Sequence, residues 1–192
     1  MTNTADPRGY YARMLAQTES IVAAVRPEQL GDATPCTDYD VRTLLSHIVG
    51  GIKRCAVVGE GGNVYASPSM VDGVADDGWQ EAYQEATARA VAVWADDARL
   101  DTIVTVPWGT VPGRVALSGY VQETLMHGWD LAMATGQQTE LDPELATWTL
   151  ALAQRILPPE PRGGEIPFGP VVPVGAEAGV HAQLAGWLGR KQ

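Results

Sequence analysis

The sequence predicts a mostly α-helical protein, a bundle built on four principal helices. Two observations indicate this fold class. Alanine and leucine are plentiful whereas phenylalanine occurs once, and this composition favours helix over strand. Apolar residues also recur at intervals of three and four along several segments, as they do on the buried face of a helix. At 192 residues the chain is long enough for one substantial core, so we expect residues 1–192 to form a single domain.

Charge and composition exclude several classes of partner. The net charge of -10 argues against nucleic acid and anionic membranes, which both attract basic surfaces. No segment approaches the roughly 20 apolar residues that a membrane span needs. The start of the chain, Met1–Pro7, lacks the basic and apolar runs of a secretion signal, and two cysteines form no disulfide framework. We therefore expect a cytoplasmic protein, either a monomer or a homodimer.

The first two helices are predicted from apolar spacing and from the residues that bound them. Tyr10–Val25 carries apolar residues at helical intervals and ends before Pro27, which restricts the residue preceding it. The proline- and glycine-containing stretch Arg26–Asp38 is typical of a loop. Asp40 is the expected N-cap of the second helix, Val41 to about Gly59.

The middle of the chain is predicted to contain a long connection, a third helix and a small β-hairpin. Gly59–Gly78 is rich in Gly, Ser and Asp, a composition typical of a segment that can move and cover a site. Trp79–Ala95 has helical spacing. Thr102–Val106 and Val111–Val115 are short β-prone runs that we expect to pair as a hairpin.

Two further helices are predicted after the hairpin. Ala116–Thr135 has helical spacing, and Gly136 is expected to end this fourth helix as its C′ residue. Asp142 is the expected N-cap of a fifth helix, which runs to Leu157 before two prolines.

Residues 166–192 are expected to form an extension packed on the bundle. The run Ile166–Val174 contains too many prolines for a central strand, so we expect it to lie extended across the surface. A short helix near Ala178–Leu188 follows.

The fourth predicted helix carries an acidic residue and a histidine on one face. Glu123 and His127 are four residues apart and therefore lie one above the other, with Asp130 nearly one turn further on. A buried carboxylate needs a partner, and a divalent cation is such a partner. The alternative is an ordinary surface pair worth about 0.3 kcal/mol.

His47 adds a third ligand candidate on a second helix. Of the three histidines in the chain, His47 and His127 both lie in strongly helical segments. Gly50 and Gly51 follow His47, and glycines inside a helix indicate close packing or a neighbouring ligand. The alternative for His47 is a half-buried histidine bonded to a backbone carbonyl. We expect His181 to be exposed and exclude it from the site.

Two histidines and one carboxylate would leave coordination positions open for water or substrate, whereas closed structural zinc sites use four ligands. Zinc is the first candidate, and the same ligand types also suit nickel or iron. Asp130 is the candidate support because a ligating imidazole usually donates its other N–H to a carboxylate or carbonyl. We expect Asp130 to reach His47 across the bundle, the alternative being a surface carboxylate. Cys36 and Cys55 are expected to be inert thiols.

Three blocks in order, Thr34–Gly51, Gln122–Ala132 and Phe168–Val174, resemble actinobacterial DinB-like metal-binding proteins, which are similar to the N-terminal domain of mycothiol-dependent maleylpyruvate isomerase. The resemblance implies a DinB-like four-helix bundle whose metal is held by His47, Glu123 and His127. It also implies that the thiol of mycothiol binds at the open metal position and attacks an electrophile.

Three hypotheses for function follow. The leading one is a metal-dependent transferase or isomerase that uses a low-molecular-weight thiol, such as mycothiol, on a small electrophile. The second is a metal-binding protein without turnover, such as a stress-related or ligand-sensing protein. In the third, Glu123 and His127 merely pair with each other.

Overall fold

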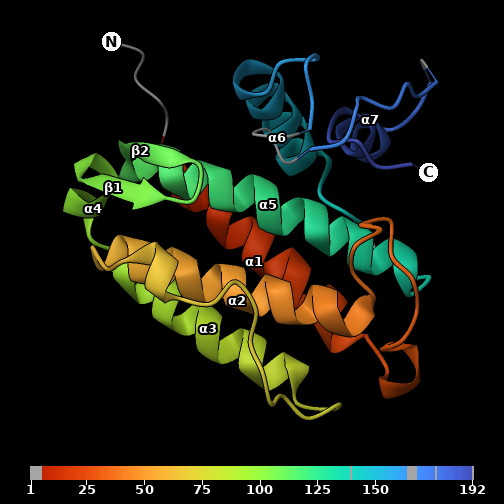
Figure 1. Ribbon diagram of the computed structural model, residues 1–192, viewed down its shortest axis with the longest axis horizontal. Helices are drawn as coiled ribbons and strands as arrows, with labels where there is room; N and C mark the ends of the chain where they lie inside the picture. The colour runs from red at the N-terminus through yellow and green to blue at the C-terminus, as the bar shows by residue number, and fades with distance from the viewer. Residues whose placement is uncertain (1–5, 139, 164–167, 176, 192) are drawn as a thin grey trace.

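Four long helices form the core of the computed structural model, which describes residues 6–138, 140–163, 168–175 and 177–191 (Figure 1). They are α1 (Arg8–Ala23), α2 (Val41–Gly59), α3 (Trp79–Trp94) and α5 (Gly113–Ala134). Helix α1 packs against α3 and α5, and α2 packs against the same two helices. The predicted mostly α-helical, four-helix architecture is confirmed.

Helix α2 forms as predicted because its first turn is capped and one side of it is apolar. The Asp40 side chain accepts a hydrogen bond from the Thr43 backbone N–H at 2.8 Å, which satisfies a group that the helix itself cannot. The apolar side is buried in the core; its residues include Val41, Leu44, Leu45, Ile48, Val49 and Ile52. The predicted bounds of α2 match the observed ones.

Helix α5 is buried along most of its length because α1, α2, α6 and the hairpin all contact it. It begins at Gly113, three residues before the predicted start. It ends as predicted, since Gly136 adopts a φ of 65°, a left-handed conformation that glycine takes without steric cost.

A short helix and a two-stranded hairpin connect α3 to α5. Strand β1 (Ile103–Val106) pairs antiparallel with β2 (Gly109–Pro112), which confirms the hairpin. The second strand begins two residues before the predicted run, and it ends at Pro112 because Gly113 already belongs to α5. Helix α4 (Asp97–Asp101), capped by the side chain of Asp96, was not predicted.

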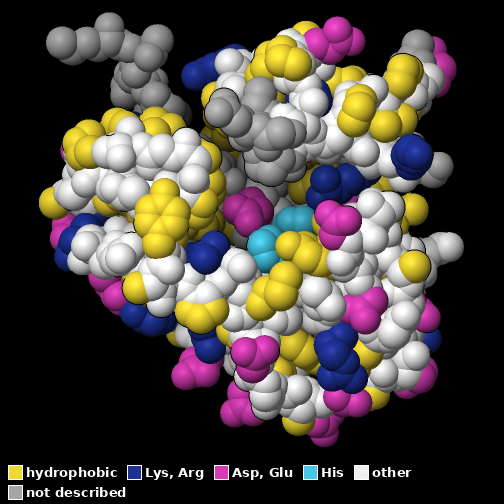
Figure 2. Space-filling model, viewed as in Figure 1, with side chains coloured by type: hydrophobic (Ala, Val, Ile, Leu, Met, Phe, Trp, Pro, Cys, Tyr) yellow, Lys and Arg dark blue, Asp and Glu magenta, His cyan; other side chains and the backbone are white. Residues whose placement is uncertain are grey.

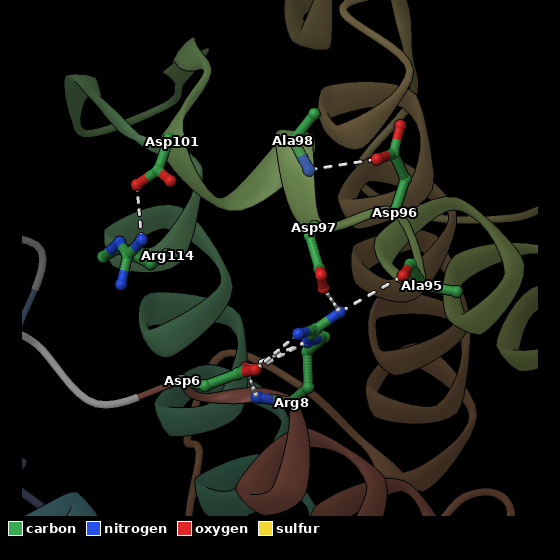
Figure 3. A network of polar contacts seen from close by, with 8 residues as sticks. All are labelled: Asp6, Arg8, Ala95, Asp96, Asp97, Ala98, Asp101 and Arg114. Atoms are coloured by element: carbon green, nitrogen blue, oxygen red, sulfur yellow. Dashed lines mark hydrogen bonds and ion pairs between the residues drawn. The ribbon is translucent and has the colours of Figure 1, made fainter.

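Exposed ion pairs tie the start of α1 to α4 (Figure 3). The Arg8 guanidinium lies 2.6 Å from Asp6 and 2.7 Å from Asp97. Arg114, near the start of α5, pairs with Asp101 at the end of α4. Exposed pairs of this kind contribute little stability each, so the fold depends mainly on the apolar core.

The connection between α2 and α3 lies along α2. It contains the 3-10 helix η2 (Val64–Ala66), and a similar turn, η1 (Pro27–Gln29), lies in the loop before α2. Three side chains of α2 contact the backbone of this connection. Ser46 bonds to Val71, His47 contacts the Ser69 carbonyl oxygen, and Arg54 donates to the Ser67 carbonyl oxygen. The segment therefore adjoins the candidate site, while its mobility stays a prediction.

Helices α6 (Pro143–Ile156) and α7 (Val180–Trp187) pack on each other beside α5 (Figure 1). The Asp142 side chain caps α6 as predicted. Of the run predicted to be extended, residues 166 and 167 lie outside the described part of the chain. The rest of that run has neither helix nor strand, and the Val172 N–H donates to the Gly186 carbonyl oxygen at 2.9 Å. That residues 1–192 form one domain stays a prediction.

Across the described residues, no helix combines the length and the apolar character that crossing a bilayer requires.

Candidate metal centre

His47 lies on α2 with one ring nitrogen fixed by the backbone. Its Nδ1 is 3.1 Å from the carbonyl oxygen of Ser69. A carbonyl oxygen can only accept, so the proton of a neutral imidazole resides on Nδ1 and the lone pair on Nε2. This outcome agrees with the backbone-bonded alternative for His47 and also leaves Nε2 free to act as a ligand.

Helix α5 supplies the two other residues. Glu123 and His127 stand one turn apart, as their spacing predicts, and Glu123 faces His47 across the helix pair. The Glu123 Oε1 atom lies 3.2 Å from His47 Nε2, and the two imidazole rings are perpendicular with centroids 5.0 Å apart. One ligand atom from each of these three residues lies within 4.8 Å of the others.

The contact between His47 and Glu123 requires a proton or a cation between the two atoms. With its proton on Nδ1, a neutral His47 points a lone pair at a carboxylate oxygen, which is repulsive. A proton on either of the two atoms, or a bound cation, makes the contact favourable. Two ligands at 2.1 Å from a tetrahedral zinc ion are separated by roughly 3.4 Å, close to the observed 3.2 Å. The donor set and its spacing therefore fit a divalent cation.

Neighbouring side chains favour the ionised form of the Glu123 carboxyl group. Burial alone would raise the pKa of its carboxyl group, but the hydrogen bond and charge of His47, with smaller contributions from His127 and Arg54, hold that pKa below its ordinary value. The side chain is 34% exposed, compared with 15% for His47 and 12% for His127. The cluster is thus sheltered and still reachable from solvent.

Asp130 contacts His127 and not His47. We expected it to reach across the bundle, but its Oδ2 atom lies 3.2 Å from His127 Nδ1 on the same helix, and His47 uses Ser69 instead. Residues three apart on a helix are neighbours, so this contact is geometrically natural. A carboxylate that accepts from Nδ1–H leaves Nε2 of His127 for a metal.

Arg190, beyond α7, reaches the same carboxylate. Its guanidinium donates to both oxygens of Asp130 at 3.0 to 3.3 Å, and the Asp130 side chain is fully buried. No feature of the sequence links residues 130 and 190, because the contact depends on how the C-terminal segment folds back on α5.

Cys36 and Tyr39 are site neighbours that the sequence reasoning did not place there. The Tyr39 ring contacts both imidazoles, with centroids 5.2 Å from His47 and 6.4 Å from His127. Cys36 is half-buried; burial raises the pKa of its thiol, and the charge of Arg190 opposes that shift. Their position just before α2, in the first of the three blocks, is the signal that could have found them.

The prediction for His181 is wrong. We expected it to be exposed, but packing of α7 on α6 half-buries it, and burial lowers its pKa. Its Nε2 atom has no hydrogen-bond partner among the described residues. It does not join the three-residue cluster.

Figure 2 shows histidine side chains in a hollow near the centre of the face drawn, with acidic and basic side chains beside them and hydrophobic ones around. The fold and this cluster together define a class: a helical bundle protein that presents two histidines and a carboxylate at one point between two helices.

Sequence comparison gives the family. The model of the mycothiol maleylpyruvate isomerase N-terminal domain matches residues 11–132, and the chain belongs to this family. It is 37% identical over 185 residues to the uncharacterized protein Rv0738 of Mycobacterium tuberculosis strain H37Rv, a match that covers 96% of this chain and 98% of that protein. The uncharacterized protein MT0763 of strain CDC 1551 matches to the same extent.

A solved structure supports the fold. The crystal structure of a mutant of the mycothiol-dependent maleylpyruvate isomerase has a TM-score of 0.55 with this chain. The match covers 77% of this chain and 68% of that one at 19% identity, which is a likeness of fold. The expected DinB-like bundle and the resemblance to this domain family are thereby confirmed.

Proposed function

We propose that this protein binds one divalent metal ion, zinc in the first place, through His47, Glu123 and His127. We further propose that it uses the ion to transfer or isomerise a small electrophile with a low-molecular-weight thiol as cosubstrate. The proposal rests on one observation: three ligand atoms from two helices lie within 4.8 Å of one another.

The chain's own residues would prepare the site for the ion. The Ser69 carbonyl oxygen and the Asp130 carboxylate accept from the two Nδ1 atoms, so each imidazole would keep the lone pair of Nε2 for the ion. Glu123 adds one negative charge, which lowers the net charge of the centre. Three protein ligands leave room for a further one from outside, as in catalytic zinc sites.

Thiol chemistry is the use that the family supports. A bound divalent cation makes a thiolate available at neutral pH, where a free thiol is mostly protonated. The Glu123 side chain is partly exposed, so a thiol could reach the centre from solvent. The matching family is named for a mycothiol-dependent isomerase, which makes mycothiol the first thiol to test.

The test is an adduct-formation assay. Zinc-loaded protein is mixed with mycothiol and chlorodinitrobenzene, and His127→Ala and zinc alone serve as controls. We expect the wild type to exceed both controls. No rate above background with mycothiol or other small thiols would contradict the enzyme proposal; if zinc still binds, that result would favour a metal-binding protein without turnover.

A further inference from the structure

A second set of metal-ligating side chains overlaps the candidate centre. The Cys36 sulfur, an imidazole nitrogen of His127 and a carboxylate oxygen of Asp130 also lie within 4.8 Å of one another. The two sets share His127, whose Nδ1 faces Asp130 and whose Nε2 is left for the other set. Thiolate, imidazole and carboxylate are all ligand types that zinc accepts.

The second set already holds a cation supplied by the chain itself. The Arg190 guanidinium makes three hydrogen bonds to the two oxygens of Asp130. The Asp130 side chain is fully buried and that of Arg190 is 14% exposed, so water screens this pair weakly. The positive charge of Arg190 also acts on Cys36.

We propose that Arg190 determines which of two overlapping positions takes a metal ion. First, its guanidinium occupies the place of a cation beside Cys36, His127 and Asp130. Second, it thereby directs an incoming metal ion to His47, Glu123 and His127. The second half of this proposal rests on the proposed function, whereas the first half does not.

The physical reason is competition for one carboxylate. With both oxygens bonded to Arg190 and one of them also accepting from His127, Asp130 has little capacity left for a metal. Removing Arg190 would leave a buried carboxylate without its cation, which is unfavourable, and a divalent ion would relieve it. Binding there would convert the Cys36 thiol to a metal-bound thiolate and release its proton to solvent.

Cobalt(II) absorption tests the proposal, because a thiolate ligand adds a charge-transfer band in the near ultraviolet that nitrogen and oxygen ligands do not give. We would titrate cobalt into the wild type, Arg190→Met, and Arg190→Met combined with Cys36→Ser, each in a thiol-free reductant. Lys191→Met, which removes the neighbouring exposed charge, is the matched control. Cys55 is fully buried and does not compete for the ion.

We expect the thiolate band in Arg190→Met alone, its loss in the double variant, and none in the wild type or in Lys191→Met. A band in the wild type, or an Arg190→Met spectrum identical to that of the wild type, would overturn the proposal. If the wild type binds no cobalt while Arg190→Met binds it through Cys36, the metal site under the proposed function fails and the blocking role of Arg190 stands. If neither binds cobalt, both fail.

A second variant keeps the test valid if Arg190→Met does not fold. His47→Ala removes a ligand of the first position and leaves Arg190 in place. We expect it to bind cobalt more weakly than the wild type, with no thiolate band. A thiolate band in His47→Ala would show the ion moving to Cys36 past Arg190, contrary to the proposal.

Discussion

The Nδ1 atoms of His47 and His127 face two different kinds of acceptor. Each imidazole must hold one proton away from the site, and His47 does so against a backbone carbonyl oxygen while His127 uses the buried carboxylate of Asp130. Both arrangements fix which ring nitrogen keeps its lone pair. At the residue scale the candidate centre is therefore defined by the atoms behind the ligands as much as by the ligands.

Glu123 is the residue whose chemistry can be changed with least change of shape. Glu123→Gln keeps the side-chain volume but removes the negative charge. We therefore expect zinc affinity to fall by roughly 100-fold, because substituting residues that only contact the metal ligands already costs about 10- to 100-fold. Competition with a chromophoric chelator measures the change. Glu85→Gln, an exposed carboxylate on α3, is the control, and equal affinities in the two variants would argue against Glu123 as a ligand.

Two adjacent glycines in α2 have opposite roles at the scale of the element. An added Cβ at Gly50 would lie 2.4 Å from the Ser69 carbonyl oxygen and 2.8 Å from the Met70 nitrogen, so the neighbouring backbone would have to move. At Gly51 nothing lies within 4 Å. Close packing, one of the two readings of these glycines, is therefore confirmed for Gly50 alone.

Alanine substitutions separate these roles. Gly50→Ala should cost about 1–3 kcal/mol of unfolding free energy through overpacking, and should weaken zinc binding by moving the Ser69 carbonyl oxygen away from His47. Gly51→Ala should be neutral or add up to about 1 kcal/mol through helix propensity. Urea denaturation and chelator competition measure both effects. A Gly50→Ala variant as stable as Gly51→Ala would contradict the close contact.

The Asp40 cap makes the stability of α2 depend on pH. Hydrogen bonds from Thr43 lower the pKa of the Asp40 carboxyl. Because the folded pKa lies below the unfolded one, the stabilisation is fully present above the unfolded pKa and is lost as pH falls through the folded pKa. Asp40→Ala should cost about 1 kcal/mol at pH 7 and less near pH 3. Urea titrations at both pH values test this; a difference that is the same at both would contradict it.

Sequence patterns predicted the elements whose determinants are local. The caps Asp40 and Asp142 and the stop at Gly136 depend on the residues beside them, and all three are confirmed. Glu123 and His127 share a face for the same reason. The two partners of Asp130 differ in this respect. Its contact with His127 is between neighbours three residues apart on α5, which the spacing allows, whereas its bond to Arg190 depends on the path of the segment after α7, which no spacing encodes.

At the scale of the whole molecule, the candidate centre joins two helices that are far apart in the sequence. His47 comes from α2 and the other two ligand candidates come from α5. Ser69, before α3, contacts His47, and Arg190, after α7, contacts Asp130. A metal ion at this point would link four parts of the chain. Binding should therefore stabilise the whole fold.

Thermal unfolding measures that link. With free zinc at 100 times its dissociation constant, we expect about 2.7 kcal/mol of stabilisation and a rise in Tm of about 5–10 °C for a chain of this size. His127→Ala should show no such rise. An unchanged Tm in wild type at saturating zinc would show that the ion does not bind preferentially to the folded state.

Metal content is the most direct test of the central claim, that His47, Glu123 and His127 hold one divalent ion. Untagged wild type and His127→Ala would be purified from cells grown with zinc, nickel and iron available, and then analysed by plasma mass spectrometry. The account predicts one divalent ion per wild-type chain and a large loss in the variant. A wild-type content near zero, or an equal content in both proteins, would contradict it.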